Sequence, residues 1–248
     1  MDFMRHRTDS ERSGFDLQGL LDFSALEKPV KQHLTKVYGA LAMASTICAA
    51  GAYCAIQGLV PAIFTGFLSL IAVLGLTIWL ISTEPSPQNQ DKRMGMFMGV
   101  AALMGINMAG LIEMVIAINP QIVFTALMVT TVVFTCFSLA ALLSGNQRQF
   151  LYLGGILSSG LMSLMVIRLI GMLTGSKIAM DLTMYLGLAI LCGFVLFDTQ
   201  MIVMKCRAGD RDYIKHALDL FIDAVGLFKH IMVLLAQKED RRNNKRRN

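Results

Sequence analysis

Long apolar stretches with very few charged residues fill the middle of the chain. A helix needs around 20 residues to cross about 30 Å of hydrocarbon, and seven stretches have roughly that length. We expect spans at Val37–Ile56, Leu59–Ile81, Met94–Ile118, Ile122–Leu143, Phe150–Ile170, Leu182–Met204 and Ala217–Ala236. Only 16% of the 248 residues are charged, against about 25% in soluble domains. The sequence therefore predicts an all-α integral membrane protein, a seven-helix bundle.

Charged residues gather at the two ends of the chain. This pattern predicts a polar N-terminal arm over residues 1–36, a transmembrane domain over residues 37–236 and a basic tail over residues 237–248. The arm has no apolar core ahead of a cleavage site, so we expect the first span to act as the signal.

The distribution of lysine and arginine predicts the orientation. These residues concentrate in Met1–Lys36, Ser82–Arg93, Ser144–Gln149 and Lys205–Lys215, while the opposite side has only Lys177. Loops rich in lysine and arginine stay in the cytosol, which predicts a cytosolic N-terminus.

The basic tail conflicts with this rule, because seven spans would leave it on the other side. The last helix therefore either crosses against the rule or is re-entrant. The tail itself is either a solvated, disordered segment or a contact for anionic lipid or a partner protein.

Two aspartates, Asp198 and Asp223, lie within the last two spans. A carboxylate at the membrane centre costs about 2.5–3.5 kcal/mol. Asp198 precedes the Lys205–Lys215 loop by seven residues and Asp223 follows it by eight, so both lie roughly 10–12 Å below the boundary, whereas Asp219 lies at about 6 Å. Two carboxylates in contact share a proton. The matched depth favours such a pair over two carboxylates that are satisfied separately.

The last span has one polar stripe on an otherwise apolar helix. The stripe comprises His216, Asp219, Asp223, Gly226 and His230, at spacings of three and four residues. Such residues share one face of a helix. We expect this helix to lie inside the bundle, with the stripe toward its neighbours.

Two further charged residues are secondary candidates. Glu113 lies six residues before Asn119, about 9 Å from the turn on the non-cytosolic side; it either lines a water-filled mouth or is a structural, hydrogen-bonded acid. Arg93 begins the third span and either anchors it at the cytosolic surface or reaches toward the aspartate pair.

Several motifs together resemble the Bax inhibitor-1 family, in its eukaryotic, endoplasmic-reticulum branch. They are Gln32-His-Leu-Thr-Lys-Val-Tyr38, Tyr152-Leu-Gly-Gly155, Gly193-Phe-Val-Leu-Phe-Asp-Thr-Gln200, Gly209-Asp-Arg-Asp-Tyr-Ile-Lys-His216 and Asp219-Leu-Phe-Ile-Asp223. The resemblance implies six outer helices around a central last helix. It also implies a calcium leak with a pH-sensitive pair at Asp198 and Asp223, lowered calcium stores, suppressed cell death and association with Bcl-2-type proteins.

Three functions compete at this stage. Two or three carboxylates cannot form a tight calcium site, which needs six to eight oxygens, but they can form the weak transit site of a leak. An intramembrane aspartyl protease fits poorly, because its Gly-x-Gly-Asp stretch is absent. A non-transporting adaptor that restrains apoptosis would act through the arm and the tail.

No enzymatic fingerprint appears at a credible position in the sequence, so we expect no enzyme and no cofactor, with calcium and protons only as transported or sensed ions. The expected partners are membrane lipids, calcium, Bcl-2-type proteins and further copies of the chain, but no nucleic acid.

Overall fold

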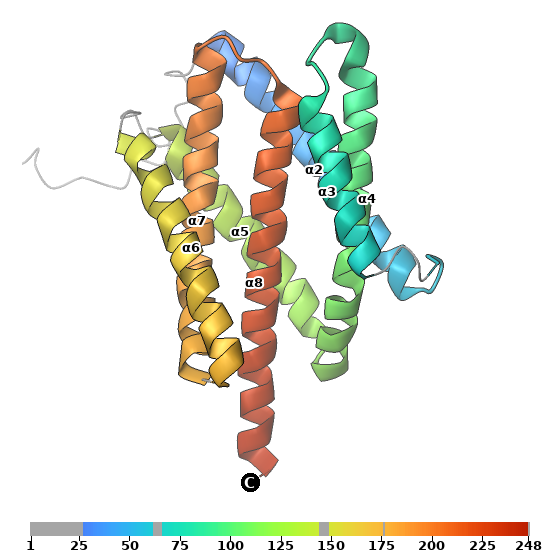
Figure 1. Ribbon diagram of the computed structural model, residues 1–248, viewed down its shortest axis with the longest axis vertical. Coiled ribbons are helices and arrows are strands. Elements are labelled where there is room, and N and C mark those ends of the chain that lie inside the picture. The colour runs from blue at the N-terminus through green and yellow to red at the C-terminus, as the bar shows by residue number, and fades with distance from the viewer. Residues whose placement is uncertain (1–26, 62–65, 144–148, 176, 248) are drawn as a thin grey trace, which may run out of the picture.

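Helices account for all of the regular secondary structure in the described residues of the computed structural model, which are 27–61, 66–143, 149–175 and 177–247 (Figure 1). The helices are α2 (Lys28–Ile56), α3 (Phe67–Ser82), the short 3₁₀ helix η3 (Pro87–Asn89), α4 (Gln90–Ile118), α5 (Gln121–Leu143), α6 (Gln149–Thr174), α7 (Lys177–Arg207) and α8 (Tyr213–Arg247). The predicted all-α membrane fold is confirmed.

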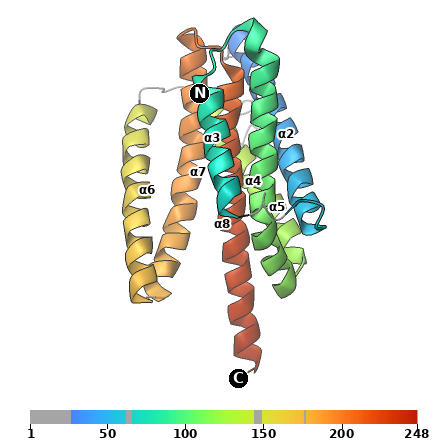
Figure 2. The same ribbon diagram turned by 45° about the vertical axis from the view of Figure 1, so that its right-hand side comes forward.

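The last helix lies at the centre of the bundle. α8 packs mainly against α2, α4, α5 and α7, whereas α3 packs on α4 and α6 packs on α7 (Figures 1 and 2). Leu220, Leu227 and Met232 of α8 are fully buried, and the Phe221 ring meets Phe97 of α4 edge to face, with 5.7 Å between centroids. Its apolar faces therefore hold α8 in the core.

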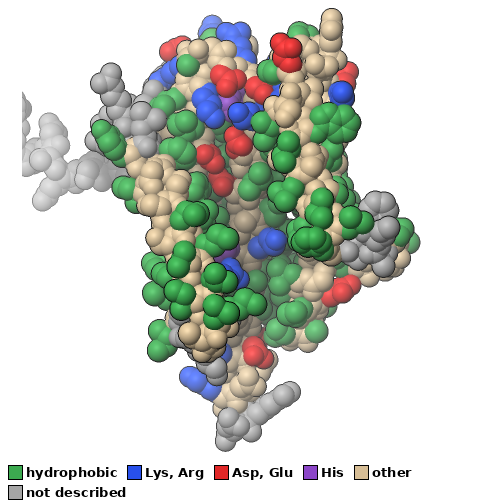
Figure 3. Space-filling model, viewed as in Figure 1, with side chains coloured by type: hydrophobic (Ala, Val, Ile, Leu, Met, Phe, Trp, Pro, Cys, Tyr) green, Lys and Arg blue, Asp and Glu red, His purple; other side chains and the backbone are tan. Residues whose placement is uncertain are grey.

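The outer surface of the bundle is apolar. Large hydrophobic side chains such as Trp79, Phe124, Ile156 and Met172 are more than half exposed. Figure 3 shows hydrophobic side chains over much of the visible face, with many of the charged groups near its upper end and others lower down. Among the described residues, five helices are long and apolar enough to cross a membrane, and α3 is a shorter apolar helix. The protein is therefore a multi-pass membrane protein.

Small residues bring α2 and α4 into close contact. A Cβ on Gly51 would lie 2.6 Å from the Ala102 carbonyl oxygen, and one on Gly105 would overlap the Cys48 carbonyl. Because lipid tails are as apolar as the helices themselves, close backbone approach at small residues supplies the packing energy. This contact fixes the register of α2 against α4.

Two boundaries at the start of the chain differ from the sequence prediction. α2 begins at Lys28, inside the predicted arm 1–36, with Pro29 in its first turn, where the missing N–H of proline costs nothing. α3 begins at Phe67 rather than Leu59, because Pro61 interrupts the segment and Gly58 and Gly66 adopt φ of 71° and 92°. Residues 1–26 of the arm lie outside the described part of the chain, as does Arg148 of the predicted Ser144–Gln149 loop.

The last helix differs most. α8 is unbroken from Tyr213 to Arg247, so the re-entrant alternative is wrong, and the interpretation of the tail as disordered is wrong for residues 237–247. Strong helix formers such as Gln, Lys, Glu and Arg fill this segment, and Arg241 pairs with Asp181 of α7. The helix is about 52 Å long, and its C-terminus lies at the opposite end of the bundle from the α7–α8 connection (Figure 1).

Candidate functional site

Asp198 of α7 and Asp223 of α8 meet inside the bundle. The two helices are antiparallel neighbours because only residues 208–212 connect them, with Gly209 at φ 98° in the turn. The two carboxyl groups lie close enough for each to influence the charge of the other. Asp223 is 7% exposed, and its Oδ2 has no hydrogen-bond partner among the described residues. A hydrogen bond between two carboxyl groups forms only when one of them is protonated, because a carboxylate has no proton to donate.

Asp219 lies one helical turn from Asp223, toward the α7–α8 connection. It is half-buried, and its charge acts on both Asp198 and Asp223. The site is therefore a close carboxyl pair with a third carboxylate nearby, the arrangement of the three aspartates that the depth argument predicts.

The polar stripe of α8 faces α7 below the aspartate pair. A Cβ on Gly187 of α7 would lie 2.8 Å from His230 Nε2, and a Cβ on Gly226 would lie 3.4 Å from Leu191 Cδ2. The stripe is thus shielded from lipid by a neighbouring helix, as the sequence indicates.

The carboxylates do not form a closed metal cage. Among the described residues, no group of three or more His, Cys, Asp or Glu side chains is arranged to hold a metal ion. Calcium requires many more oxygens than a carboxyl pair supplies. The arrangement can exchange a proton and offer oxygens to a cation that brings its own water.

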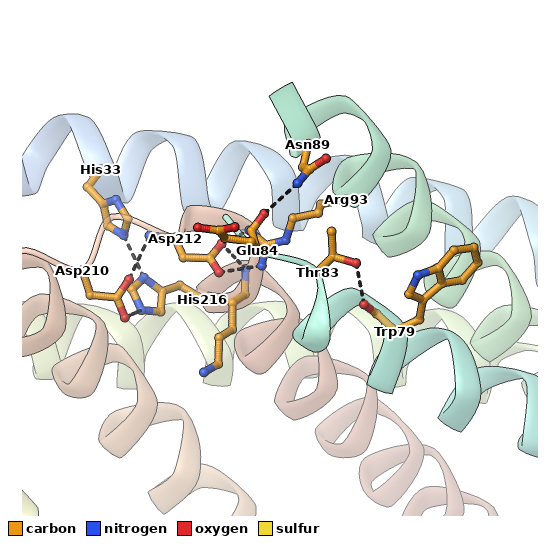
Figure 4. Close-up of polar contacts among 10 residues, drawn as sticks. His33, Trp79, Thr83, Glu84, Asn89, Arg93, Asp210, Asp212 and His216 are labelled. Atoms are coloured by element: carbon orange, nitrogen blue, oxygen red, sulfur yellow. Dashed lines mark hydrogen bonds and ion pairs between the residues drawn. The ribbon is translucent and has the colours of Figure 1, made fainter. Parts of the chain in front are cut away.

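Arg93 bonds to the α7–α8 connection and not to the aspartate pair, so the interpretation of Arg93 as a cation that reaches the pair is wrong. Its Nη1 donates to Asp212 Oδ1 at 2.8 Å and its Nη2 donates to Asp212 Oδ2 at 2.5 Å (Figure 4). The side chains are 2% and 9% exposed. Burial alone would raise the pKa of Asp212, but the hydrogen bonds from Arg93 and the Lys215 amide outweigh it and lower this pKa below its usual value.

His216, at the start of the stripe, lies against α2 and not against the aspartate pair. Its Nδ1 lies 2.9 Å from Nε2 of His33 on α2, and its Nε2 lies 3.8 Å from Asp210 Oδ2 (Figure 4). The side chain is fully buried. His216 therefore joins α8 to α2 near the α7–α8 connection, apart from the aspartate pair.

Glu113 lines a cavity of about 690 Å³ at the other half of the bundle. The end of α2, the start of α3, the middle of α4 and Lys229 of α8 complete its wall. Glu113 is exposed, so the structure places its carboxylate in a cavity rather than in a buried structural contact.

Sequence reasoning missed His33, Asp210, Asp212 and Lys229. His33 and the two aspartates lie in the motifs that carry the family resemblance. The motifs therefore drew attention to these residues but did not show which side chains they contact. Lys229 lies next to the polar stripe but off its face, and the α8 sequence alone does not indicate which neighbour it meets.

Comparisons with known proteins identify the family. A family model described as inhibitor of apoptosis-promoting Bax1 matches residues 30–240. The chain is 43% identical over 232 residues to Bax inhibitor 1 of Bos taurus and 41% identical over 232 residues to that of Homo sapiens; each match covers 93% of this chain and 97% of the relative. Bax inhibitor 1 of Arabidopsis thaliana is 37% identical over 217 residues, 87% of this chain and 85% of the relative. The resemblance seen in the sequence motifs is confirmed.

Proposed function

Since the chain belongs to the Bax inhibitor-1 family, an apoptosis-inhibiting family of membrane proteins, we propose that it is a pH-sensitive calcium leak channel of the endoplasmic-reticulum membrane. The leak lowers stored calcium and thereby suppresses cell death. Asp198 and Asp223 are its proton sensor and its weak calcium transit site, and the N-terminus is cytosolic.

The close approach of the carboxyl groups of Asp198 and Asp223 inside the bundle is the observation that carries this proposal. With one proton the two carboxyl groups attract each other and connect α7 to α8. After that proton is lost, two negative charges repel each other and attract a cation. A single proton therefore changes both the contact between two helices and the affinity of the site for calcium.

A weak site suits a leak better than a tight one. An ion must bind well enough to enter and weakly enough to leave. The pair provides few oxygens, and Asp219 adds a third carboxylate within electrostatic reach, so a hydrated calcium ion exchanges its water only in part.

The test is calcium flux from liposomes that contain the pure protein, measured from pH 5.5 to 8. Asp198→Asn and Asp223→Asn each remove a titrating member of the pair, and we expect each to make the calcium flux depend less steeply on pH. Asp219→Asn is the matched control and should change the profile less. Wild-type flux no higher than in protein-free liposomes would overturn the leak, and identical profiles for all three variants would overturn the sensor.

A second candidate is a non-transporting adaptor that restrains apoptosis through protein contacts. The helical basic extension of α8 beyond the apolar spans favours it, because Lys238, Arg242 and Lys245 are exposed there. Deleting residues 238–248 separates the two functions. The leak predicts unchanged flux in liposomes, whereas the adaptor predicts lost protection of cells with no flux in either form.

A further inference from the structure

The cavity beside Glu113 contains one charged side chain of each sign. Glu113 of α4 and Lys229 of α8 both line it, together with Asn107 and the apolar side chains of Phe67, Leu70 and Ile106. Asn107 is satisfied, since its Oδ1 accepts from Ser69 and its Nδ2 donates to the Leu103 carbonyl. Glu113 and Lys229 form no ion pair within the described part of the chain. The cavity therefore presents two charges of opposite sign that are not joined in an ion pair.

Lys229 lies on the helix that carries the proposed sensor. It follows Asp223 by six residues on α8, about 9 Å along the axis. It is exposed, and its charge is felt by Cys48 of α2 and by His230. Lys229 therefore places a positive charge in the cavity, on the same helix as Asp223.

We propose that Lys229 is a specificity-determining residue that opposes cation entry at the non-cytosolic mouth, and that Glu113 offsets it. This inference rests on the proposed leak function and names two further residues for it. With both charges present the charged lining of the cavity sums to zero, so the mouth neither concentrates nor excludes calcium strongly. Removal of one charge leaves the other unopposed.

The two neutral variants have opposite expected effects. Lys229→Gln leaves Glu113 alone, and calcium flux should rise about three- to fivefold in 0.01 M salt, the effect of one unit charge on a divalent ion about 10 Å away in water. Glu113→Gln leaves Lys229 alone, and flux should fall by about the same factor. The double variant should return to within about twofold of the wild type, because the same two opposing effects cancel.

The experiment measures calcium flux from liposomes for the wild type, these three variants and the charge-retaining variants Lys229→Arg and Glu113→Asp. Thermal unfolding first shows whether the purified variants are equally stable. If Lys229→Gln unfolds early, the flux of the double variant is compared with that of Glu113→Gln, because these two proteins also differ only at Lys229. Repeating the series in 1 M salt should remove the differences, since the screening length falls from about 30 Å to about 3 Å.

The failures are distinguishable. Wild-type flux at the protein-free level overturns the proposed leak and this inference with it. A second outcome is that the wild type conducts calcium while Lys229→Gln and Glu113→Gln have the same flux as the wild type, or both change it in the same direction. That outcome overturns only the role of the two charges and leaves the proposed leak standing. Differences that persist in 1 M salt also overturn the electrostatic role.

Discussion

At the scale of single residues, Arg93 and Asp212 hold the α7–α8 connection onto α4 by a nearly buried, two-pronged ion pair. Removing one partner of such a pair costs more than the pair contributes, because the other charge stays buried without compensation. His216 and His33 make a second contact close by, from α8 to α2. Together these four side chains join three helices and the α7–α8 connection at one end of the bundle.

Asp212→Asn should therefore lower the free energy of unfolding by about 3–5 kcal/mol. The measurement is unfolding of the detergent-solubilised protein, with Asp240→Asn as control, because Asp240 is exposed on the α8 extension. The double variant Arg93→Met with Asp212→Leu should recover part of the loss. An Asp212→Asn protein as stable as the control would contradict the contact.

The same ion pair predicts a pH dependence. The pKa of Asp212 is lower in the folded protein than in the unfolded chain, where it is about 3.9. Its stabilisation is thus fully present above the unfolded pKa and is lost as the pH falls through the lowered folded pKa. As the pH falls from about 5 to about 3, the unfolding midpoint of the wild type should drop further than that of Asp212→Asn, and parallel curves would count against this assignment.

At the scale of helices, the close contact of α2 with α4 depends on glycine. Gly105→Ala places a methyl group against the Cys48 carbonyl, where the backbone must move. On the same helix, Gly95 has open space around its Cβ position, and Gly95→Ala should raise the free energy of unfolding by up to about 1 kcal/mol.

We expect the two alanine variants to differ in sign. Gly105→Ala should lower the free energy of unfolding by an amount typical of overpacking, about 1–3 kcal/mol, while Gly95→Ala should leave it unchanged or raise it. Thermal unfolding of both proteins in one detergent checks this, and a common direction for both variants is the outcome that rules out the glycine contact.

At the scale of the whole protein, the unbroken α8 predicts where the tail emerges. Its apolar middle lies in the bundle core, and its two ends lie at opposite ends of the bundle (Figure 1). We therefore expect the basic tail to emerge on the opposite side of the membrane from the basic α7–α8 connection, against the usual distribution of lysine and arginine. The physical reason for this expectation is the burial of α8 among four other helices.

Cysteine labelling tests this topology in sealed vesicles, in a background without native cysteines. Arg211→Cys and Asn244→Cys place single thiols at exposed positions near the two ends of α8. A membrane-impermeant maleimide added outside should label one of them and reach the other only after permeabilisation. Labelling of both before permeabilisation would show that α8 returns to its starting side.

Sequence analysis alone predicts the membrane class, the seven apolar segments, the matched depth of Asp198 and Asp223 and the stripe on the last helix. These properties depend on composition and spacing along single helices, which hydropathy and a rise of about 1.5 Å per residue describe well. The family followed from the motifs for the same reason, since they are local.

The contacts between side chains of different helices became clear only from the way the helices pack. Arg93 bonds to Asp212 and His216 to His33 because of how α4, α2 and the α7–α8 connection rotate and pack against one another. Lys229 shares a cavity with Glu113 although 116 positions separate them along the chain (229 − 113). The continuation of α8 to Arg247 was also undecided, because helix formers and basic charge in the tail favour different outcomes until packing against α7 selects one. Helix spacing orders side chains on one helix, and contacts between helices arise only when the core is packed.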